Sequence, residues 1–361
     1  MKIRRVTGII AIITLLVSGC GNHGIVIDPG NDAVTTNESV TESTVTETES
    51  SEKKEDEAKV PDRFEFNPHV YSPTLAQDIS QEKWDALYNL CDAVRKGEST
   101  FECANQEAYD FAILDTTLAN FFPAASIRVS GESDDGSVPF ENGVGKIYYK
   151  MPVDEFVARE AEFEKLIVDI LNNNLETDDT DFEKCLKLYL YVAENYDYSE
   201  DQDFGGDAAF YRTFIDKKGT CVDFAAVYSY LLLQVGVDAL DIGCDAQDMC
   251  HAWTYAVVGG KAYHIDTTWA LKSNFEGVDG IYLDYFMMSD EGRVDSGCPI
   301  DNLTMQPLPQ FFVSNSKLKL LAADETYSFP SFSIFVSLDE ENKIVHYLDM
   351  DGNQCEMKYA D

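Results

Sequence analysis

The sequence predicts an α+β fold in which helices precede an antiparallel sheet and a β-rich segment ends the chain. Three observations lead to this prediction. Apolar residues recur at helical spacing in several segments before residue 235, strict alternation follows from residue 251, and further alternating segments lie beyond residue 311. About 300 residues with this composition can build a sizeable core, as one large domain or as one domain with an extra layer.

The first 20 residues predict a secretory signal. Basic residues precede an apolar stretch at 6–17, which is too short to span a membrane. Residues 16–20, Leu-Val-Ser-Gly-Cys, resemble a bacterial lipobox, which implies cleavage before Cys20 and attachment of lipid to its sulfur. An ordinary signal peptide with a chance cysteine is the alternative. A lipidated Cys20 would anchor the protein at the extracellular face of the bacterial cell membrane.

Residues 21–60 predict a disordered tether, because they are rich in Thr, Ser, Glu and Asp and have few apolar residues to bury. The whole chain has 65 acidic and 27 basic residues, a net charge of −38, and most of that charge lies beyond the tether. Such a surface repels nucleic acid and would favour cationic partners, although solubility alone explains it equally well. We therefore expect no nucleic-acid role.

Beyond the tether, we expect a mixed α/β region at 61–175, a core that carries the chemistry at 176–310 and a β-rich segment at 311–361. Whether the first of these regions is a separate domain stays open. The expected elements before the core are helices at 80–95, 105–120 and 152–172, a strand at 147–150, and a helix capped by Asp179 or Thr180. We interpret these elements as parts of the packed core and find no candidate catalytic residue in them.

Cys221 is predicted to lie in the first turn of a helix. Apolar residues recur at helical spacing after it as far as Val235, Gly236 supplies a C-terminal stop, and Gly219 marks the turn into the helix. Unpaired backbone N–H groups and the helix dipole at this end favour a thiolate, and the same groups can stabilise an oxyanion. A buried and inert cysteine is the alternative.

Residues 251–258 and 261–266 flank Gly259-Gly260, a pattern that predicts a two-residue hairpin. In that register His251 and Asp266 project to the same side as diagonal neighbours. A carboxylate there can accept a hydrogen bond from one imidazole nitrogen and orient the other toward a thiol. Taken singly, the histidine could be a core residue and the aspartate a turn residue. His264 shares the face but lies farther along it, so we interpret it as structural.

The remaining cysteines leave several alternatives open. Cys91 with Cys103, or Cys244 with Cys250, could form a disulfide bond in an oxidising compartment, but spacing does not decide the connectivity. The chain has no pair of Cys-x-x-Cys motifs, so we expect no structural zinc site. Residues 349–353 faintly resemble a calcium loop but are predicted to be a plain hairpin turn between two strands.

Three motifs together resemble the transglutaminase-like superfamily, over roughly residues 180–275. They are Gly219-Thr220-Cys221, His251-Ala252-Trp253 and Asp266-Thr267-Thr268-Trp269, although Thr267 stands where the family often has Pro. The resemblance implies a papain-like core with Cys221 as nucleophile at a helix N-terminus, packed on an antiparallel sheet. It also implies His251 as the proton carrier, Asp266 as the residue that orients it, and no metal or organic cofactor. Gln202 and Tyr211 are candidates for a second oxyanion donor.

The resemblance implies an extracellular amide-bond hydrolase or transamidase that acts on protein or peptide. Members of the superfamily crosslink glutamine to lysine, cleave peptide or amide bonds, or have lost activity, so the substrate stays open, and a cell-wall peptide is one candidate. An inactive binding or scaffold module at the cell envelope is the alternative. A purely structural lipoprotein that recruits basic partners is a third hypothesis.

Overall fold

The computed structural model describes residues 63–132, 138–201, 206–246, 249–274, 277–298, 300, 303–305 and 318–360. All of them belong to one unit of the chain, Ala58–Asp361. The predicted signal segment, Cys20, the tether and Gln202 lie outside the described residues. Within the described ranges, no helix is both long and apolar enough to cross a membrane.

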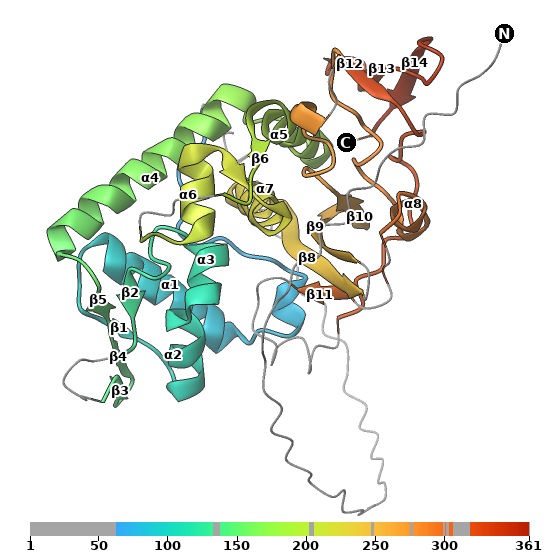
Figure 1. Cartoon of the computed structure of the whole chain (residues 1–361). Helices are drawn as coiled ribbons and strands as arrows, with labels where there is room; N and C mark the ends of the chain where they lie inside the picture. Colours follow the sequence, from blue (N-terminus) through green and yellow to red (C-terminus); the bar gives the residue numbers. More distant parts are fainter. Residues whose placement is uncertain are drawn as a thin grey trace, which may run out of the picture. The chain divides into compact units, whose positions relative to one another are not determined.

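The helices of the described residues lie mainly in the first two thirds of the sequence (Figure 1). They are α1 (Gln81–Arg95), α2 (Gln106–Ile113), α3 (Asp115–Phe121), α4 (Val153–Asn174), α5 (Asp181–Asn195), α6 (Ala209–Asp216), α7 (Cys221–Gln234) and α8 (Asp290–Asp295), with short 3-10 turns at Leu75–Gln77 and Lys272–Asn274. The predicted helices at α1, α4, α5 and α7 are confirmed. Helices α6 and α8 were not predicted.

The expected single helix at 105–120 is wrong, because the chain breaks at Leu114. This residue has an extended backbone, with φ −69° and ψ 130°, and it ends α2 and begins α3. Helical periodicity continues across the break because both helices bury apolar faces in the same core. For α5, by contrast, the expected start is confirmed: the Thr180 and Glu183 side chains form a reciprocal capping box.

The strands form five small sheets. They are β1 (Thr100–Glu102), β2 (Val129–Ser130), β3 (Phe140–Glu141), β4 (Val144–Lys146), β5 (Tyr148–Tyr149), β6 (Asp197–Tyr198), β7 (Lys218–Gly219), β8 (Asp238–Ala246), β9 (Met249–Val258), β10 (Lys261–Ile265), β11 (Leu303–Met305), β12 (Ile334–Asp339), β13 (Ile344–Leu348) and β14 (Gln354–Lys358). Among the described residues, the sheet orders are β10-β9-β8-β11, β12-β13-β14, β1-β4-β3, β2-β5 and β6-β7. Within the described part of the chain, β6-β7 is the one parallel pair.

The C-terminal β-rich segment is confirmed. Strands β13 and β14 pair from Ile344↔Lys358 to Leu348↔Gln354, and β12 adds a third strand to this sheet. The connecting turn is the plain turn that was predicted, since Asp349 Oδ1 accepts hydrogen bonds from the backbone N–H groups of Asp351 and Asn353.

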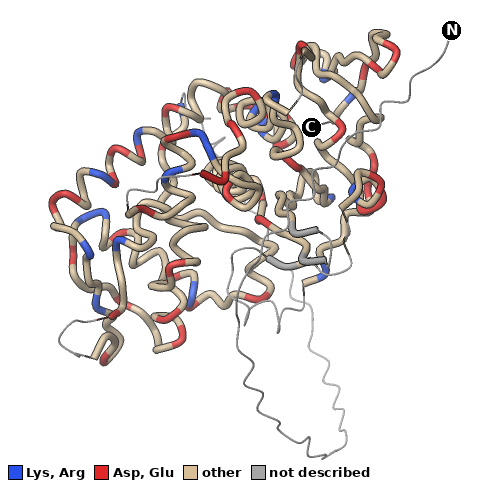
Figure 2. The backbone as a smooth tube through the Cα atoms, viewed as in Figure 1, with Lys and Arg blue, Asp and Glu red and all other residues tan. Residues whose placement is uncertain are grey.

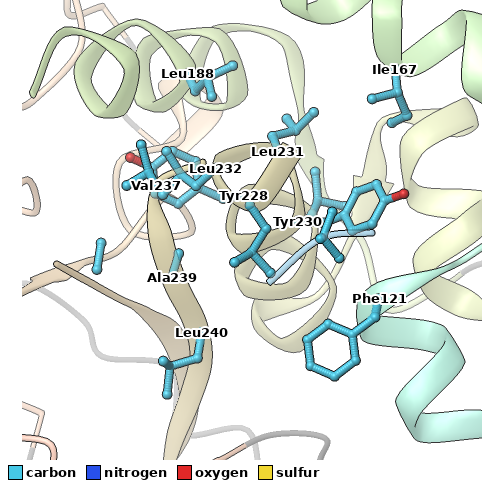
Figure 3. Close-up of a cluster of buried hydrophobic side chains, with 14 of the residues drawn as sticks. Phe121, Ile167, Leu188, Tyr228, Tyr230, Leu231, Leu232, Val237, Ala239 and Leu240 are labelled. Atoms are coloured by element: carbon cyan, nitrogen blue, oxygen red, sulfur yellow. The ribbon is translucent and has the colours of Figure 1, made fainter. Parts of the chain in front are cut away.

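Helix α7 lies in the middle of the hydrophobic core, against β8 and β9 (Figure 1). Every residue from Asp223 to Gln234 is buried, so this helix is enclosed on all sides, as a central helix is. Figure 3 shows Tyr228, Leu231 and Leu232 of α7 clustered with side chains from β8 and α5. Packing on all sides holds α7 rigidly, and with it the residue at its N-terminus.

The acidic residues are spread over many helices and loops of the described chain (Figure 2). Several of them form ion pairs within the fold, for example Glu164 with Arg95 and Asp207 with Arg128 and Arg159. This distribution is compatible with the solubility role that the sequence suggested for the negative charge.

Candidate active site

Cys221 is the first residue of α7 and is only partly buried. The preceding residue, Thr220, is the N-cap, and its backbone N–H and its hydroxyl both donate to Asp223 Oδ2, at 2.7 and 2.9 Å. The carboxylate thereby fixes the chain at the start of the helix. The predicted position of Cys221 in the first turn, beside backbone N–H groups that have no acceptor within the helix, is confirmed.

Glycine is required at position 219 because the first turn of α7 lies very close to the backbone of β7. A Cβ atom on Gly219 would lie 2.7 Å from Asp223 Cβ and 3.1 Å from Thr213 Oγ1. On its other side, β7 pairs with β6, so that Gly219 lies opposite Tyr198. The backbone N–H of Ser199 then donates to the Gly219 carbonyl at 2.8 Å. The chain that delivers Cys221 to the helix is therefore held on two sides.

The hairpin that carries the histidine and the aspartate has the predicted register, from Val258↔Lys261 to Thr254↔Ile265. Gly259 and Gly260 both have positive φ, 58° and 75°, as a two-residue turn of this type requires. Asp266 follows the last paired residue, and its backbone N–H donates to the Tyr285 carbonyl at 2.8 Å. The end of β10 is thus fixed by a segment that is distant in the sequence.

His251 and Asp266 meet, as the register predicts. The distance from His251 Nε2 to Asp266 Oδ2 is 2.7 Å, and the two residues are 7% and 0% exposed. The Cys221 side chain also acts on this imidazole, because its interaction with the ring raises the pKa of His251. Because Nε2 is occupied by Asp266, Nδ1 is the ring nitrogen that remains for the thiol. The structure therefore brings together the three residues that the sequence singled out.

The electrostatics favour an imidazolium next to a carboxylate. Burial alone lowers the pKa of His251, but the Asp266 charge, the hydrogen bond to Asp266 and the interaction with the Cys221 side chain outweigh it and raise this pKa to about 9. For Asp266, burial raises the pKa, while the positive charges of His251 and Arg293 lower it by more. The net direction is downward, so Asp266 is a carboxylate at neutral pH.

Arg293, which no sequence motif indicated, lies in α8 and is fully buried. Its Nη2 is 2.9 Å from Asp266 Oδ2, an ion pair whose angles fall outside those of a hydrogen bond. The guanidinium carbon is 4.3 Å from the ring centre of Trp253 and 4.4 Å from that of Trp269, so the cation lies against both indoles. Ser289, followed by two acidic residues, was a helix-start signal for α8, but no local pattern connects Arg293 with Asp266.

Aromatic rings enclose the imidazole. Trp269 stacks on His251 with ring centres 4.8 Å apart and an interplanar angle of 16°. The Trp269 backbone N–H also donates to Asp266 Oδ1 at 3.0 Å, so both carboxylate oxygens are engaged. These contacts limit rotation of the His251 ring and exclude water from the His251–Asp266 pair.

His264 is structural, as expected. Its Nδ1 accepts a hydrogen bond from Trp253 Nε1 at 2.9 Å, and its Nε2 lies 2.9 Å from Asp290 Oδ1. Burial lowers the pKa of His264, and the opposing effect of Asp290 does not reverse that direction. This neutral histidine links Trp253 of the hairpin to the first residue of α8.

The two candidates for a second oxyanion donor receive no support. Gln202 lies outside the described residues, and the Tyr211 ring packs on Phe163 and below the Arg159 guanidinium, both in α4. Tyr198, which the sequence did not single out, is instead close to Cys221. Burial raises its pKa, a negative charge on Cys221 raises it further, and the residue is 44% exposed.

Seven cysteines have described side chains, and all seven are free thiols. Cys91 and Cys103 are both buried and no bond joins them, so the bridge suggested for this pair is wrong in this structure. The side chain of Cys250 lies outside the description, which leaves the alternative with Cys244 untested. The Cys244 sulfur instead lies 3.4 Å from the sulfur of Cys298. In the described part of the chain, no group of His, Cys, Asp and Glu has the arrangement of a metal site.

A family model for the transglutaminase-like superfamily matches residues 169–267. These residues form a transglutaminase-like domain. The transglutaminase-like domain includes Cys221, His251 and Asp266, and the predicted α+β class with such a core is confirmed. Helices α1 to α4 mostly precede it and the β12-β13-β14 sheet follows it.

Solved structures show weaker likenesses. A candidate cysteine protease from Cytophaga hutchinsonii is 21% identical with a TM-score of 0.25, over 32% of this chain and 39% of that one. LapG from Legionella pneumophila is 16% identical with a TM-score of 0.22, over 32% of this chain and 64% of that one. The chain therefore spans less than two thirds of either protein, and the family assignment rests on the family model. No curated protein matches the sequence.

Proposed function

We propose that this protein is a cysteine-dependent amide-bond hydrolase or transamidase that acts on protein or peptide. The observation that carries the proposal is the His251–Asp266 hydrogen bond of 2.7 Å, made by an imidazole whose pKa the Cys221 side chain also raises. A thiol, an imidazole and a carboxylate in this order are the components of cysteine acyl transfer.

In the first half of the reaction, the Cys221 thiolate attacks the carbonyl carbon of an amide. The backbone N–H groups of the first turn of α7 are the donors available to the resulting oxyanion. The imidazolium of His251 then donates its proton to the leaving nitrogen, the carbon–nitrogen bond breaks, and a thioester on Cys221 remains. Asp266 holds the imidazole ring in place while the charge of His251 changes.

In the second half, water or an amine attacks the thioester. Neutral His251 accepts the proton of this nucleophile, the carbon–sulfur bond breaks, and the thiolate and imidazolium are regenerated. Water gives hydrolysis and an amine gives transamidation. Since the chemistry of Cys221, His251 and Asp266 is the same for both, the acceptor is decided by what else reaches the thioester. Tyr198 is a candidate for substrate contact, because its side chain is 44% exposed and interacts with the charge of Cys221.

The test is to trap the acyl group. The protein is incubated with a peptide panel that includes cell-wall peptides, with and without a primary amine, and the mass of the Cys221 peptide is then measured. We expect an acyl adduct, and turnover, in the wild type and in Cys355→Ser, a control that alters a partly exposed cysteine in β14. Both signals should be absent in Cys221→Ala. A wild type that forms no adduct and acts on no peptide contradicts the enzymatic proposal and favours an inactive binding module.

We further propose that lipid on Cys20 anchors the protein at the extracellular face of the membrane. The support is the lipobox-like segment at residues 16–20. Metabolic labelling with an alkyne-tagged fatty acid should label the wild type and leave Cys20→Ser unlabelled. A labelled Cys20→Ser variant, or an unlabelled wild type recovered in the medium, would contradict the anchor.

A further inference from the structure

We propose that Cys244 and Cys298 form a disulfide bond when the protein is oxidised, and that this bond ties α8 to strand β8. The two sulfurs lie 3.4 Å apart, and the residues are 3% and 0% exposed. A disulfide bond is about 2.0 Å long, so the sulfurs need to approach by little more than 1 Å, about the change that small side-chain rotations produce.

The bond would connect two elements of the candidate active site. Cys244 is paired with His251 across the β8–β9 ladder. Cys298 follows α8, and its backbone N–H donates to the carbonyl of Arg293 at 3.3 Å. The bridge would therefore join the strand beside His251 to the helix whose arginine contacts Asp266.

The segment that leads into α8 is held to β10 by two backbone hydrogen bonds of 2.8 Å between Met288 and His264, and the bridge from Cys298 would hold the other end of the helix. Helix α8 is six residues long, and its polar links to the hairpin are the Arg293–Asp266 ion pair and the His264–Asp290 hydrogen bond. A helix this short is not stable by itself. A covalent link at its C-terminal end would hold Arg293 between the two tryptophan rings when the fold fluctuates.

The chemistry of the pair suits thiol–disulfide exchange. The hydrogen bond between the two sulfurs lowers the pKa of Cys244, and the Arg293 guanidinium acts in the same direction. Cys244 is therefore the attacking thiolate. Leu303 of the short edge strand β11 pairs with Cys244. Local opening of β11 would give an oxidant access to the Cys244 sulfur.

The oxidant is a disulfide, either of low molecular weight, such as oxidised glutathione, or of a protein. The Cys244 thiolate attacks one sulfur of this disulfide, which forms a mixed disulfide and releases the first thiolate. Cys298 loses its proton and attacks the Cys244 sulfur, which releases the second thiolate. Two cysteine thiols are thus oxidised, one disulfide is reduced to two thiols, and two protons are exchanged.

The bond can be mapped in the full chain, equilibrated with oxidised or reduced glutathione and then alkylated. Cleavage on the amino side of aspartates places Cys221, Cys244, Cys250 and Cys298 in four separate peptides, 216–222, 241–244, 248–265 and 295–300. We expect peptide 241–244 linked to 295–300 in the oxidised sample and both peptides alkylated in the reduced one. A link from 295–300 to 248–265, or full alkylation of 241–244 after oxidation, overturns the proposal.

A second measurement is the melting temperature. The bond closes the segment 244–298 and so reduces the conformational freedom of the unfolded chain. We expect the oxidised wild type to melt several degrees above the reduced protein. This difference should vanish in Cys298→Ser and Cys244→Ser but persist in Cys355→Ser, and its persistence in Cys298→Ser would contradict the proposal. The peptide map uses the wild-type protein, so it tests the proposal even if a variant fails to fold. Neither measurement depends on enzymatic activity.

Discussion

Arg293 Nη2 lies 2.9 Å from Asp266 Oδ2, and both side chains are fully buried. Asp266 therefore faces two cations, since His251 bonds to the same oxygen. A buried carboxylate beside one cation has a higher pKa than a buried carboxylate beside two, so it takes up a proton more readily. The second cation lets Asp266 remain charged in both halves of the proposed reaction, including the stage at which His251 is neutral.

The first prediction concerns Arg293→Met, which removes this second cation but leaves apolar volume between the indoles. We expect unfolding free energy at pH 7 to fall by about 3 kcal/mol, because an incompletely compensated charge stays buried. The pKa of Asp266 should rise, which moves the acid limb of the kcat/KM profile to higher pH. Urea unfolding and the pH profile are the two measurements.

Arg293→Lys is the matched variant, because it retains the charge but not the planar group that lies against Trp253 and Trp269. We expect the acid limb of the kcat/KM profile of Arg293→Lys to lie close to that of the wild type, while its unfolding free energy stays clearly lower. An Arg293→Met enzyme with an unchanged pH profile would show that Arg293 only fills space.

The second prediction concerns Asp266→Asn. The amide keeps the size of the side chain but places no negative charge between His251 and Arg293. We expect kcat/KM to fall by roughly 10³- to 10⁴-fold, the range found when a comparable aspartate of a hydrolase triad is changed to asparagine. Steady-state kinetics on the substrate identified by acyl trapping measures this effect. A decrease of only a few-fold would mean that Asp266 does not orient the proton carrier.

The third prediction concerns the pH dependence of stability. The pKa of His251 in the folded protein is about 9, above the unfolded value of 6.5. Its contribution is therefore fully present below about pH 6.5 and is lost as the pH rises to about 9. The expected loss is about 3 kcal/mol, measured by urea unfolding across this interval.

The control for this pH series is His251→Gln, which cannot be protonated. Its stability should vary less over the same interval, and the difference between the two curves isolates His251. Parallel curves for the wild type and His251→Gln would show that the imidazolium form is not favoured by the fold.

The fourth prediction concerns Gly219→Ala. The added Cβ atom would meet Asp223 Cβ at 2.7 Å, so Asp223 has to move away from the Thr220 cap. We expect a loss of about 1–3 kcal/mol in unfolding free energy and slower alkylation of Cys221 by iodoacetamide. Gly292→Ala is the control, because its Cβ atom would make only ordinary contacts at 3.6 Å. Equal behaviour of the two variants would contradict the role of Gly219.

The sequence by itself determined the local geometry on which the candidate site depends. The boundaries of α7 follow from its apolar periodicity and its flanking glycines, and the Gly259-Gly260 turn sets the register that brings His251 and Asp266 to one face. These features depend on residues within one helix or one hairpin, where a repeat of 3.6 or 2 residues decides the outcome.

The tertiary structure decided what surrounds the triad residues. No local repeat indicates the break at Leu114 or the strand β8. The contacts of Arg293 with Asp266 and of Cys244 with Cys298 join segments that are far apart in the sequence. A buried charge requires a compensating charge, but any of several arginines could supply it, and only the packing of α8 against the two tryptophan rings selects Arg293.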